Sequence, residues 1–147
     1  MNSNLILTKG EMQTYFDETG KALAVTLLSG GDLKLAEVFQ AGDLITVSGF
    51  SKGKGFAGGV KRHGFKGGPK THGQSDRQRA PGSIGSTTTP GRVQRGKRMA
   101  GRMGNAKVTI KNLRVAKVDV EKNQLWVIGA VPGIEKARLQ VRKIETK

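Results

Sequence analysis

The chain has 147 residues, 26 of them Lys or Arg and 11 Asp or Glu, so its formal net charge is +15. Its hydrophobic fraction is 35%, its mean hydropathy is −0.41, and no apolar run approaches the roughly 20 residues that cross a bilayer, so we expect no membrane segment. The first residues lack the basic region and cleavage site of a secretory signal, and zero cysteines exclude disulfides, thiolate metal ligands and a cysteine nucleophile. The expected compartment is the cytoplasm.

The N-terminal part of the sequence predicts a β-hairpin. Residues 5–8 and 13–16 are short apolar segments, and DETG at residues 17–20 is a turn signal that ends in glycine. Residues 21–28 then combine alternation with β-branched side chains, as strands do. These segments make the first expected hairpin.

A second hairpin is expected in the segment that follows. Residues 29–31 (SGG) break the chain before LKLAEVF at residues 33–39, and the turn QAGD leads into LITVSG at residues 44–49. A helical turn at residues 35–39 is the alternative interpretation.

The C-terminal part also predicts strands. Apolar and polar residues alternate within residues 108–120, and the turn EKN separates them from LWVIGAV, which predicts a third hairpin. After the turn VPG, residues 138–144 are expected to form the closing strand, with Leu139, Val141 and Ile144 facing inward. No segment keeps a helical period over three turns.

These elements predict a mainly β fold with two parts. Six to eight short strands in so few residues favour a small closed β-barrel, because closure removes exposed strand edges. Residues 1–49 and 105–147 are expected to form the body of the barrel. Residues 50–104 are expected to be one long, extended basic loop inserted into it.

Residues 50–104 carry most of the charge of the protein. They hold 14 of the 22 glycines, 13 of the 26 Lys and Arg, both histidines and a single acid, Asp76, so their net charge is +12. Their few apolar residues follow neither the helical nor the strand period and cannot form a core. Because the cations repel one another and glycine is costly to order, we expect this segment to need a polyanion, and nucleic acid is the obvious candidate.

Among nucleic acids, RNA fits this segment better than DNA. A duplex major groove requires a helix or a two-stranded ribbon, neither of which is evident, whereas folded RNA offers crevices and unstacked bases. The basic side chains are expected to neutralise phosphate, and the histidines to stack or donate hydrogen bonds. The predicted RNA-binding residues are Lys52, Lys54, Lys61, Arg62, His63, Lys66, Lys70, His72, Arg77, Arg79, Arg92, Arg95, Lys97, Arg98 and Arg102.

Two glycine patterns imitate nucleotide-binding motifs and carry the alternative hypothesis of a nucleotide-phosphate-binding enzyme. Residues 53–58 match G-x-G-x-x-G, but we expect no helix after them to hold a pyrophosphate. Residues 91–97 match the start of a phosphate loop, but Arg98 replaces the Ser or Thr that would hold magnesium. We therefore expect no catalytic residue.

Two further hypotheses are weaker still. His63 and His72 have cationic neighbours and only Asp76 as a nearby acid, so we expect no metal site. Docking of the basic surface on anionic lipid would need an amphipathic helix and apolar anchors, which the sequence lacks, so we expect no membrane partner.

The residues from position 47 to 104 closely resemble ribosomal protein three of the large subunit, a universal family. The similar stretches are VSGFSKGKGFAGGVKRHGF, GGPKTHG, RAPGSIGSTTTPGRV and GKRMAGRMGN, in this order. KVTIKNLRVAKVDVEKNQLWVIGAVPG continues in the same register, and TKGEMQTYFDETGKALAVTLL resembles the opening strands of the family.

The resemblance implies a barrel of the type shared with translation factors, bound to large-subunit (23S-type) ribosomal RNA. It implies contacts with neighbouring ribosomal proteins, a role early in subunit assembly, and no enzyme activity, cofactor or small-molecule substrate. The ribosome is cytoplasmic, or alternatively organellar. The resemblance further implies that the loop reaches towards the peptidyl transferase centre, with a tip formed by Arg79, Ala80, Pro81, Gly82, Ser83, Ile84, Gly85 and Ser86.

The sequence departs from the family pattern in two places. The family usually has a substantial segment between its opening hairpin and the strands before the loop, whereas here Leu28 leads through SGG almost directly to LKLAEVF. The chain is therefore interpreted as a shortened form, natural or engineered. Bacterial members often carry a methylated glutamine after GSIG, where this chain has Ser86, so we expect no such modification.

Overall fold

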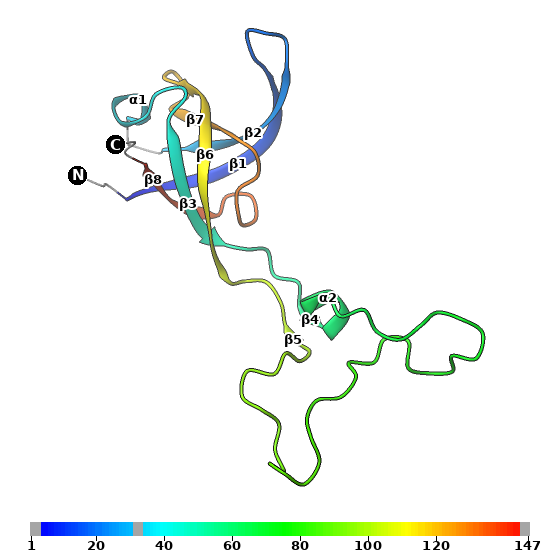
Figure 1. Cartoon of the computed structure of the whole chain (residues 1–147). Helices are drawn as coiled ribbons and strands as arrows, with labels where there is room; N and C mark the ends of the chain where they lie inside the picture. Colours follow the sequence, from blue (N-terminus) through cyan, green and yellow to red (C-terminus); the bar gives the residue numbers. More distant parts are fainter. Residues whose placement is uncertain (1–3, 31–33, 145–147) are drawn as a thin grey trace. The chain divides into compact units, whose positions relative to one another are not determined.

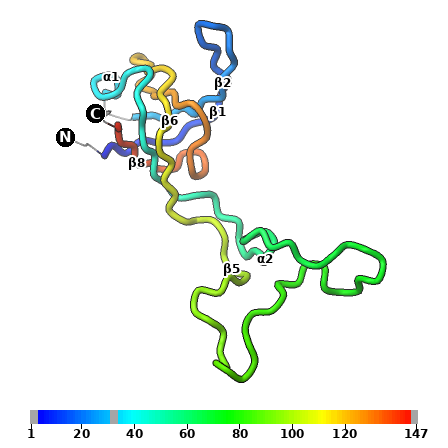
Figure 2. Tube along the Cα trace, viewed as in Figure 1, coloured from blue at the N-terminus to red at the C-terminus, as the bar shows by residue number. Residues whose placement is uncertain are grey.

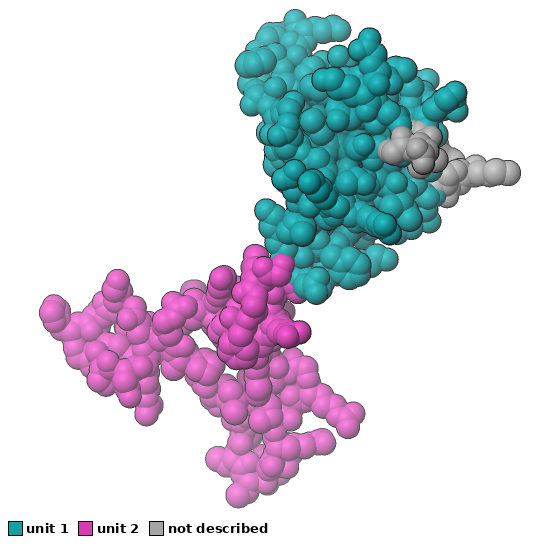
Figure 3. All heavy atoms as spheres, turned by 180° about the vertical axis from the view of Figure 1, so that it is seen from behind, with its two compact units in different colours: residues 1–52, 105–147 teal, residues 53–104 magenta. Residues whose placement is uncertain are grey.

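The computed structural model describes residues 4–30 and 34–144 of the chain. The chain divides into two compact units, which Figure 3 colours separately. We call residues 4–30, 34–52 and 105–144 the ring unit and residues 53–104 the glycine-rich unit. In chain order the elements are β1 (Leu5–Phe16), β2 (Ala22–Ser29), α1 (Leu35–Val38), β3 (Leu44–Phe50), β4 (Phe56–Ala57), α2 (Gly59–His63), β5 (Gly101–Arg102), β6 (Lys107–Asp119), β7 (Gln124–Ile128) and β8 (Arg138–Lys143) (Figure 1).

The ring unit is built from six strands that pair in the order β1-β2-β7-β6-β3-β8, with β8 returning to β1. All six pairings are antiparallel, so each strand has a partner on both sides. The predicted mainly β fold is confirmed. Closing the ring satisfies backbone groups that an open sheet would expose at its edges.

The core of the ring unit follows from the strand period. Leu7 lies opposite Leu139, and Val47 lies opposite Val141, and all four side chains are buried. Successive side chains of a strand point to opposite faces, so one apolar residue in two is enough to fill the interior. Each such side chain contributes about 1.5–3 kcal/mol by leaving water.

The segment before β3 corrects one sequence prediction. The second hairpin is wrong: residues 35–38 form the helix α1, which was the alternative interpretation. Leu35 and Phe39 are four residues apart, so a helical turn brings them to the same side, and both are buried in the core (0% and 2% exposed). Asn123, in the turn between β6 and β7, accepts a hydrogen bond from Leu35 N (3.1 Å). The predicted break at residues 29–31 lies partly outside the described residues.

The first and third predicted hairpins are confirmed as the pairs β1–β2 and β6–β7, and the closing strand as β8. The two apolar segments of the first hairpin belong to one strand, β1, whose register shifts between Lys9 and Met12. Both α1 and α2 are one-turn helices, which agrees with the absence of a helical period. Within residues 4–30 and 34–144, no helix has the length and apolar character to span a membrane.

Lys9 joins β1 to the connection that precedes β8. Its Nζ donates to the carbonyl oxygens of Val131 (3.0 Å) and Gly133 (2.7 Å). Burial lowers the pKa of Lys9 below its ordinary value, and the positive charge of Lys52 lowers it further. This ammonium therefore stabilises a loop whose carbonyls would otherwise lack partners at the end of the ring.

A methyl group at Gly49 is expected to destabilise the ring unit. Gly49 is buried in β3, and a Cβ there would collide with Leu139 Cδ2 and lie 3.3 Å from Pro132 Cγ. Because Leu139 is only 1% exposed and has little room to move, we expect Gly49→Ala to lower the free energy of unfolding by about 1–3 kcal/mol. Urea unfolding followed by Trp126 fluorescence measures this change.

Gly53→Ala is the matched control, because a Cβ at Gly53 meets no atom within 4 Å. Its unfolding midpoint should stay close to that of the unmodified chain. Equal midpoints for the Gly49 and Gly53 variants would contradict the packing described for β3.

Asp43 supplies a pH-dependent contribution to stability. Its Oδ2 accepts hydrogen bonds from Gln40 N (2.8 Å) and Lys143 Nζ (2.6 Å). Partial burial acts to raise the pKa of Asp43, but these hydrogen bonds and the charge of Lys143 outweigh it, so the pKa lies below the ordinary value of 3.8. The ionised carboxylate therefore stabilises the fold above that ordinary value, and the contribution is lost as the pH falls through the lowered pKa.

We expect Asp43→Asn to cost about 1 kcal/mol of stability at neutral pH, since the ion pair is partly exposed. The difference from the unmodified chain should shrink towards zero at an acid pH below the lowered pKa, where the carboxylate is protonated. Urea titrations at both pH values test this, and a difference that is the same at both would count against the pairing.

Candidate nucleic-acid interface

The glycine-rich unit begins with a short two-stranded ribbon. In it, Phe56 of β4 pairs with Arg102 of β5 and Ala57 pairs with Gly101. The ribbon is extended by the hydrogen bond from Met103 N to Gly55 O (2.9 Å). All of residues 53–104 are described, and Ala57 is the only one of them that is buried (3% exposed). Backbone hydrogen bonds, and not a core, therefore define this unit.

Helix α2 begins two residues after the end of β4, and hydrogen bonds join it to the backbone at Met99, shortly before β5. Arg62 donates from a guanidinium nitrogen to Met99 O (2.7 Å), and His63 Nε2 donates to the same oxygen (2.9 Å). Since a carbonyl oxygen only accepts, His63 must carry its hydrogen on Nε2. Gly101 permits this contact, because a Cβ there would lie 2.7 Å from the Arg62 guanidinium. We call this arrangement the Met99 latch.

The presence of α2 overturns one sequence prediction, namely that no helix follows the G-x-G-x-x-G pattern at residues 53–58. The helix has five residues and ends at Gly64, whose φ of 71° gives a left-handed cap with its N–H bonded to Val60 O (3.0 Å). The sequence could not predict this helix, because a single turn is too short to show a hydrophobic period. The contacts of its side chains are also made with Met99, far along the chain. One turn after a two-residue antiparallel strand also differs from the strand–helix unit that binds dinucleotides.

The chain between α2 and β5 makes two excursions, residues 65–78 and 79–100, which Figure 2 follows in two shades of green. The first is closed at its base by the hydrogen bond from Gly68 N to Gln78 O (2.8 Å). Gly67 adopts a φ of +75° at this base, and a Cβ there would collide with Gln78 O. A side chain is therefore excluded by both conformation and space. We call this the Gln78 closure.

The positive charges of this segment are turned outward. All thirteen Lys and Arg from Lys52 to Arg102 are exposed, and so is His72, whereas His63 is half-buried in the Met99 latch. Within residues 53–104 the single ion pair joins Arg77 to Asp76 at 4.0 Å, and both side chains are more than 80% exposed. Internal pairing therefore leaves almost all of the charge for an external partner.

The predicted RNA-binding residues occupy different parts of the structure. Lys52 belongs to the ring unit. Lys54 lies two residues before β4, and Arg102 is part of β5. The other predicted residues lie on α2 and on the two excursions. They are distributed as follows: on α2, Lys61, Arg62 and His63; on the first excursion, Lys66, Lys70, His72 and Arg77; on the second, Arg79, Arg92, Arg95, Lys97 and Arg98.

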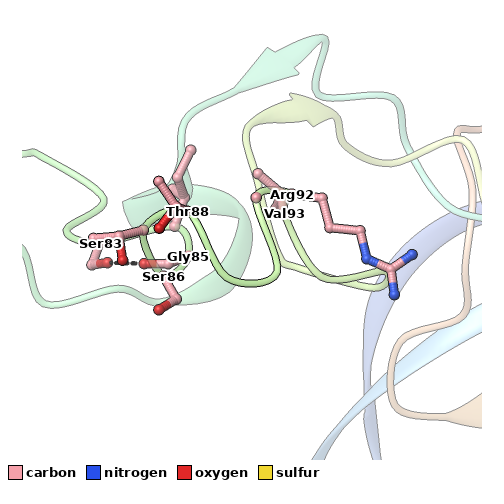
Figure 4. A pocket seen from close by; sticks show the side chains of 9 residues that line it. Ser83, Gly85, Ser86, Thr88, Arg92 and Val93 are labelled. Carbon is pink, nitrogen blue, oxygen red and sulfur yellow. Dashed lines mark hydrogen bonds between the residues drawn. The ribbon is translucent and has the colours of Figure 1, made fainter.

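All residues of the predicted loop tip except Gly82 line one or both of two hollows of the glycine-rich unit. Arg79, Ala80, Pro81 and Ile84 line one of them, together with Phe65 and other residues. The other, about 630 Å³, is lined by residues 83–88 and 91–93. Figure 4 shows Ser83 donating to Gly85 O (2.9 Å) there, while the Arg92 side chain extends away from this turn.

The ring unit carries a second basic surface, which the sequence predictions did not include. Lys107, Lys111, Arg138 and Arg142 are all exposed on the outward face of β6 and β8. Between them, on β3 and β6, Ser48 and Thr109 share a hydrogen bond of 2.8 Å. In β8, period-two alternation places Arg138 and Arg142 opposite the buried Leu139 and Val141, and that signal was available in the sequence. In β6, Lys107 and Lys111 have the same parity as the buried Val115, so simple alternation does not predict their exposure. The pairing of β3 with β6 shifts register between Ile45 and Val47, which separates these two parts of β6.

The alternative hypothesis of a nucleotide-binding enzyme also rests on residues 91–97. These residues are exposed and irregular, and neither a strand nor a helix adjoins them between residues 80 and 100, all of which are described. A phosphate loop depends on a preceding strand and a following helix that aim its amides at the phosphates. This segment lacks that scaffold.

Comparison with known proteins points to one family. The family model of ribosomal protein L3 matches residues 22–125. Proteins named large ribosomal subunit protein uL3 are similar to this chain in Dehalococcoides mccartyi (strain BAV1), with 57% identity over 119 residues, and in Herpetosiphon aurantiacus, with 59% identity over 113 residues. The matched part is 81% and 77% of this chain, and 58% and 53% of those proteins.

A third relative, from Marinobacter nauticus, bears the same name and is 55% identical over 107 residues, which are 73% of this chain and 50% of that protein. The chain thus spans about half the length of the curated relatives it matches. None of these names supports the enzyme hypothesis. The family match covers well over half of the chain and includes the whole glycine-rich unit, so the chain belongs to the ribosomal protein L3 family.

Proposed function

We propose that this chain is a structural constituent of the large ribosomal subunit and that its glycine-rich unit binds large-subunit ribosomal RNA. The observation that carries the proposal is the set of thirteen exposed cations from Lys52 to Arg102 with one acid among them. When these cations contact phosphates, they release the counterions condensed on the RNA, which favours binding. Membership of the ribosomal protein L3 family supports the choice of partner.

The two units have separate tasks in this proposal. The ring unit, with its inward apolar side chains, is a barrel of the translation-factor type that folds by itself and anchors the chain. The glycine-rich unit, with one buried residue, is an inserted basic loop that becomes rigid in a crevice of the RNA. The basic face made by Lys107, Lys111, Arg138 and Arg142 adds phosphate contacts from the ring unit.

The family resemblance extends the proposal to the setting of the site. The chain acts at the ribosome without catalysing a reaction, contacts neighbouring ribosomal proteins and supports early assembly of the subunit. Residues from Arg79 to Ser86 approach the peptidyl transferase centre. The mixture of small and apolar residues there suits a segment that lies close to packed RNA, because short side chains allow a near approach of the backbone.

RNA affinity should fall steeply with salt, and the slope should depend on the cations of the second excursion. Each cation that contacts phosphate contributes about 0.7–0.9 to the slope of log affinity against log salt. Replacing Arg92, Arg95 and Lys97 together by Gln should therefore reduce the slope by about 2–3. Filter binding to a large-subunit ribosomal RNA transcript over a salt series measures it.

The control replaces three exposed cations of the ring unit, Lys21, Lys122 and Lys136, by Gln. It removes the same charge, so a general loss of attraction would affect both triple variants alike. The proposal requires the slope of the control to stay near that of the unmodified chain. Equal slopes for the two triple variants would contradict it.

Proteolysis tests the coupling of order to RNA. In the free chain, trypsin should cut first after the exposed Lys and Arg of residues 53–104, where one buried residue gives little resistance to local opening. The ring unit should survive as larger fragments. Addition of the ribosomal RNA transcript should slow these cuts, as followed by mass spectrometry. Equal resistance of residues 53–104 with and without RNA would be evidence against this coupling.

A further inference from the structure

One hollow of the glycine-rich unit has no part in the proposed charge neutralisation. It has a volume of about 360 Å³ and is walled by apolar side chains, chiefly Val60, Phe65, Ile84 and Met99. Arg79 and Arg98 also line it, and both are exposed. The only acid of the unit, Asp76, is not among the lining residues. The hollow is thus apolar inside and positively charged at its margin.

Independent contacts hold two walls of this hollow in place. Gly59 faces the Phe65 ring, and a Cβ there would lie 2.9 Å from Phe65 Cδ2, so the absence of a side chain allows the ring to sit against α2. The His63 ring lies 5.6 Å from the Phe65 ring. On the other side, the Met99 latch fixes the backbone that carries the Met99 side chain. The hollow is therefore part of the local structure of the unit.

The apolar walls are partly exposed to water, which is unfavourable, and a ligand that covered them would remove this unfavourable free energy. Ile84 is 45% exposed and Met99 is 40% exposed, in a unit that buries a single residue. Covering such a wall with an apolar surface is favourable by about 25 cal/mol for each Å². An occupant that also carries negative charge would match Arg79 and Arg98, which line the hollow. A nucleotide has both properties, because its base has flat apolar faces and is flanked in the chain by phosphates.

We propose that this hollow takes one unstacked nucleobase of the bound RNA, with the base against Phe65 and the flanking phosphates on Arg79 and Arg98. The inference rests on the proposed function and adds a base-binding site to a surface described so far only by its charge. Stacking of a base on an aromatic ring is tolerant of base identity, because every base has a π-face. The site therefore recognises an unpaired nucleotide and not a particular sequence.

The test compares two probes of equal length and charge. One is an oligoadenylate of about a dozen nucleotides, a length within the range of known single-stranded sites, and the other is a ribose-phosphate oligomer without bases. Fluorescence anisotropy with the full chain gives the ratio of the two affinities. A stacked base is worth about 1–3 kcal/mol, so the base-bearing probe should bind about 5- to 150-fold more tightly.

Phe65→Ala should reduce this ratio at least about fivefold while leaving the affinity for the baseless probe unchanged. Phe56→Ala is the matched control, since Phe56 is 78% exposed and does not line the hollow. A second pair of variants tests the hollow without altering the packing of Phe65. Ile84→Asn places a polar group in the hollow and should lower the ratio, whereas Val93→Asn, at a residue of similar exposure (41%) outside the hollow, should not.

The outcomes separate this inference from the proposed function. A ratio unchanged in both Phe65→Ala and Ile84→Asn, with salt-dependent binding of both probes intact, overturns the base site and leaves the RNA-binding function standing. A hollow that instead receives an apolar side chain of a protein would give this result. An equal drop for Phe56→Ala and Phe65→Ala also overturns the site. If the unmodified chain binds neither probe, both the base site and the proposed function fail.

Discussion

Mutual repulsion among thirteen exposed cations is the constraint to which the rest of this structure responds. From Lys52 to Arg102, most of these cations are only a few residues from the next one along the chain. The single acid among them, Asp76, is paired with its neighbour Arg77. At physiological salt, charges within about 8 Å of one another still interact, so the segment resists collapse. The apolar residues are accordingly concentrated in the ring unit, where opposed pairs such as Leu7 with Leu139 fill the interior.

The glycine-rich unit obtains its shape from backbone hydrogen bonds in place of a core. The Met99 latch joins α2 to the residues before β5, and the Gln78 closure ends the first excursion. The second depends on Gly67, because a Cβ there would collide with the backbone oxygen of Gln78. In the first, Gly101 leaves room for the guanidinium of Arg62 as it is placed here. Glycine enrichment thus has two physical meanings here. It allows close approach within the unit, and under the proposed function it would also reduce the bulk that the unit presents to RNA.

The ring closes although the chain spans about half the length of the relatives it matches. β2 ends at Ser29 and α1 begins at Leu35, and β2 still finds a partner on each side, in β1 and β7. Leu35 and Phe39 of the short connection are themselves buried in the core. A connection of this length is therefore enough for β2 to be paired on both sides.

The sequence by itself determined the mainly β character, the hairpins β1–β2 and β6–β7, the closing strand β8 and the location of the charge, because alternation and turn residues are local signals. Only the tertiary structure decided the helices: α1 exists because Leu35 and Phe39 find the core and Asn123, and α2 because Gly64 caps it and Met99 holds it. The hollow beside Phe65 was equally invisible in the sequence, since its walls come from residues about forty positions apart. One turn of helix and one cluster of side chains carry no period, so contacts made across the chain determine them.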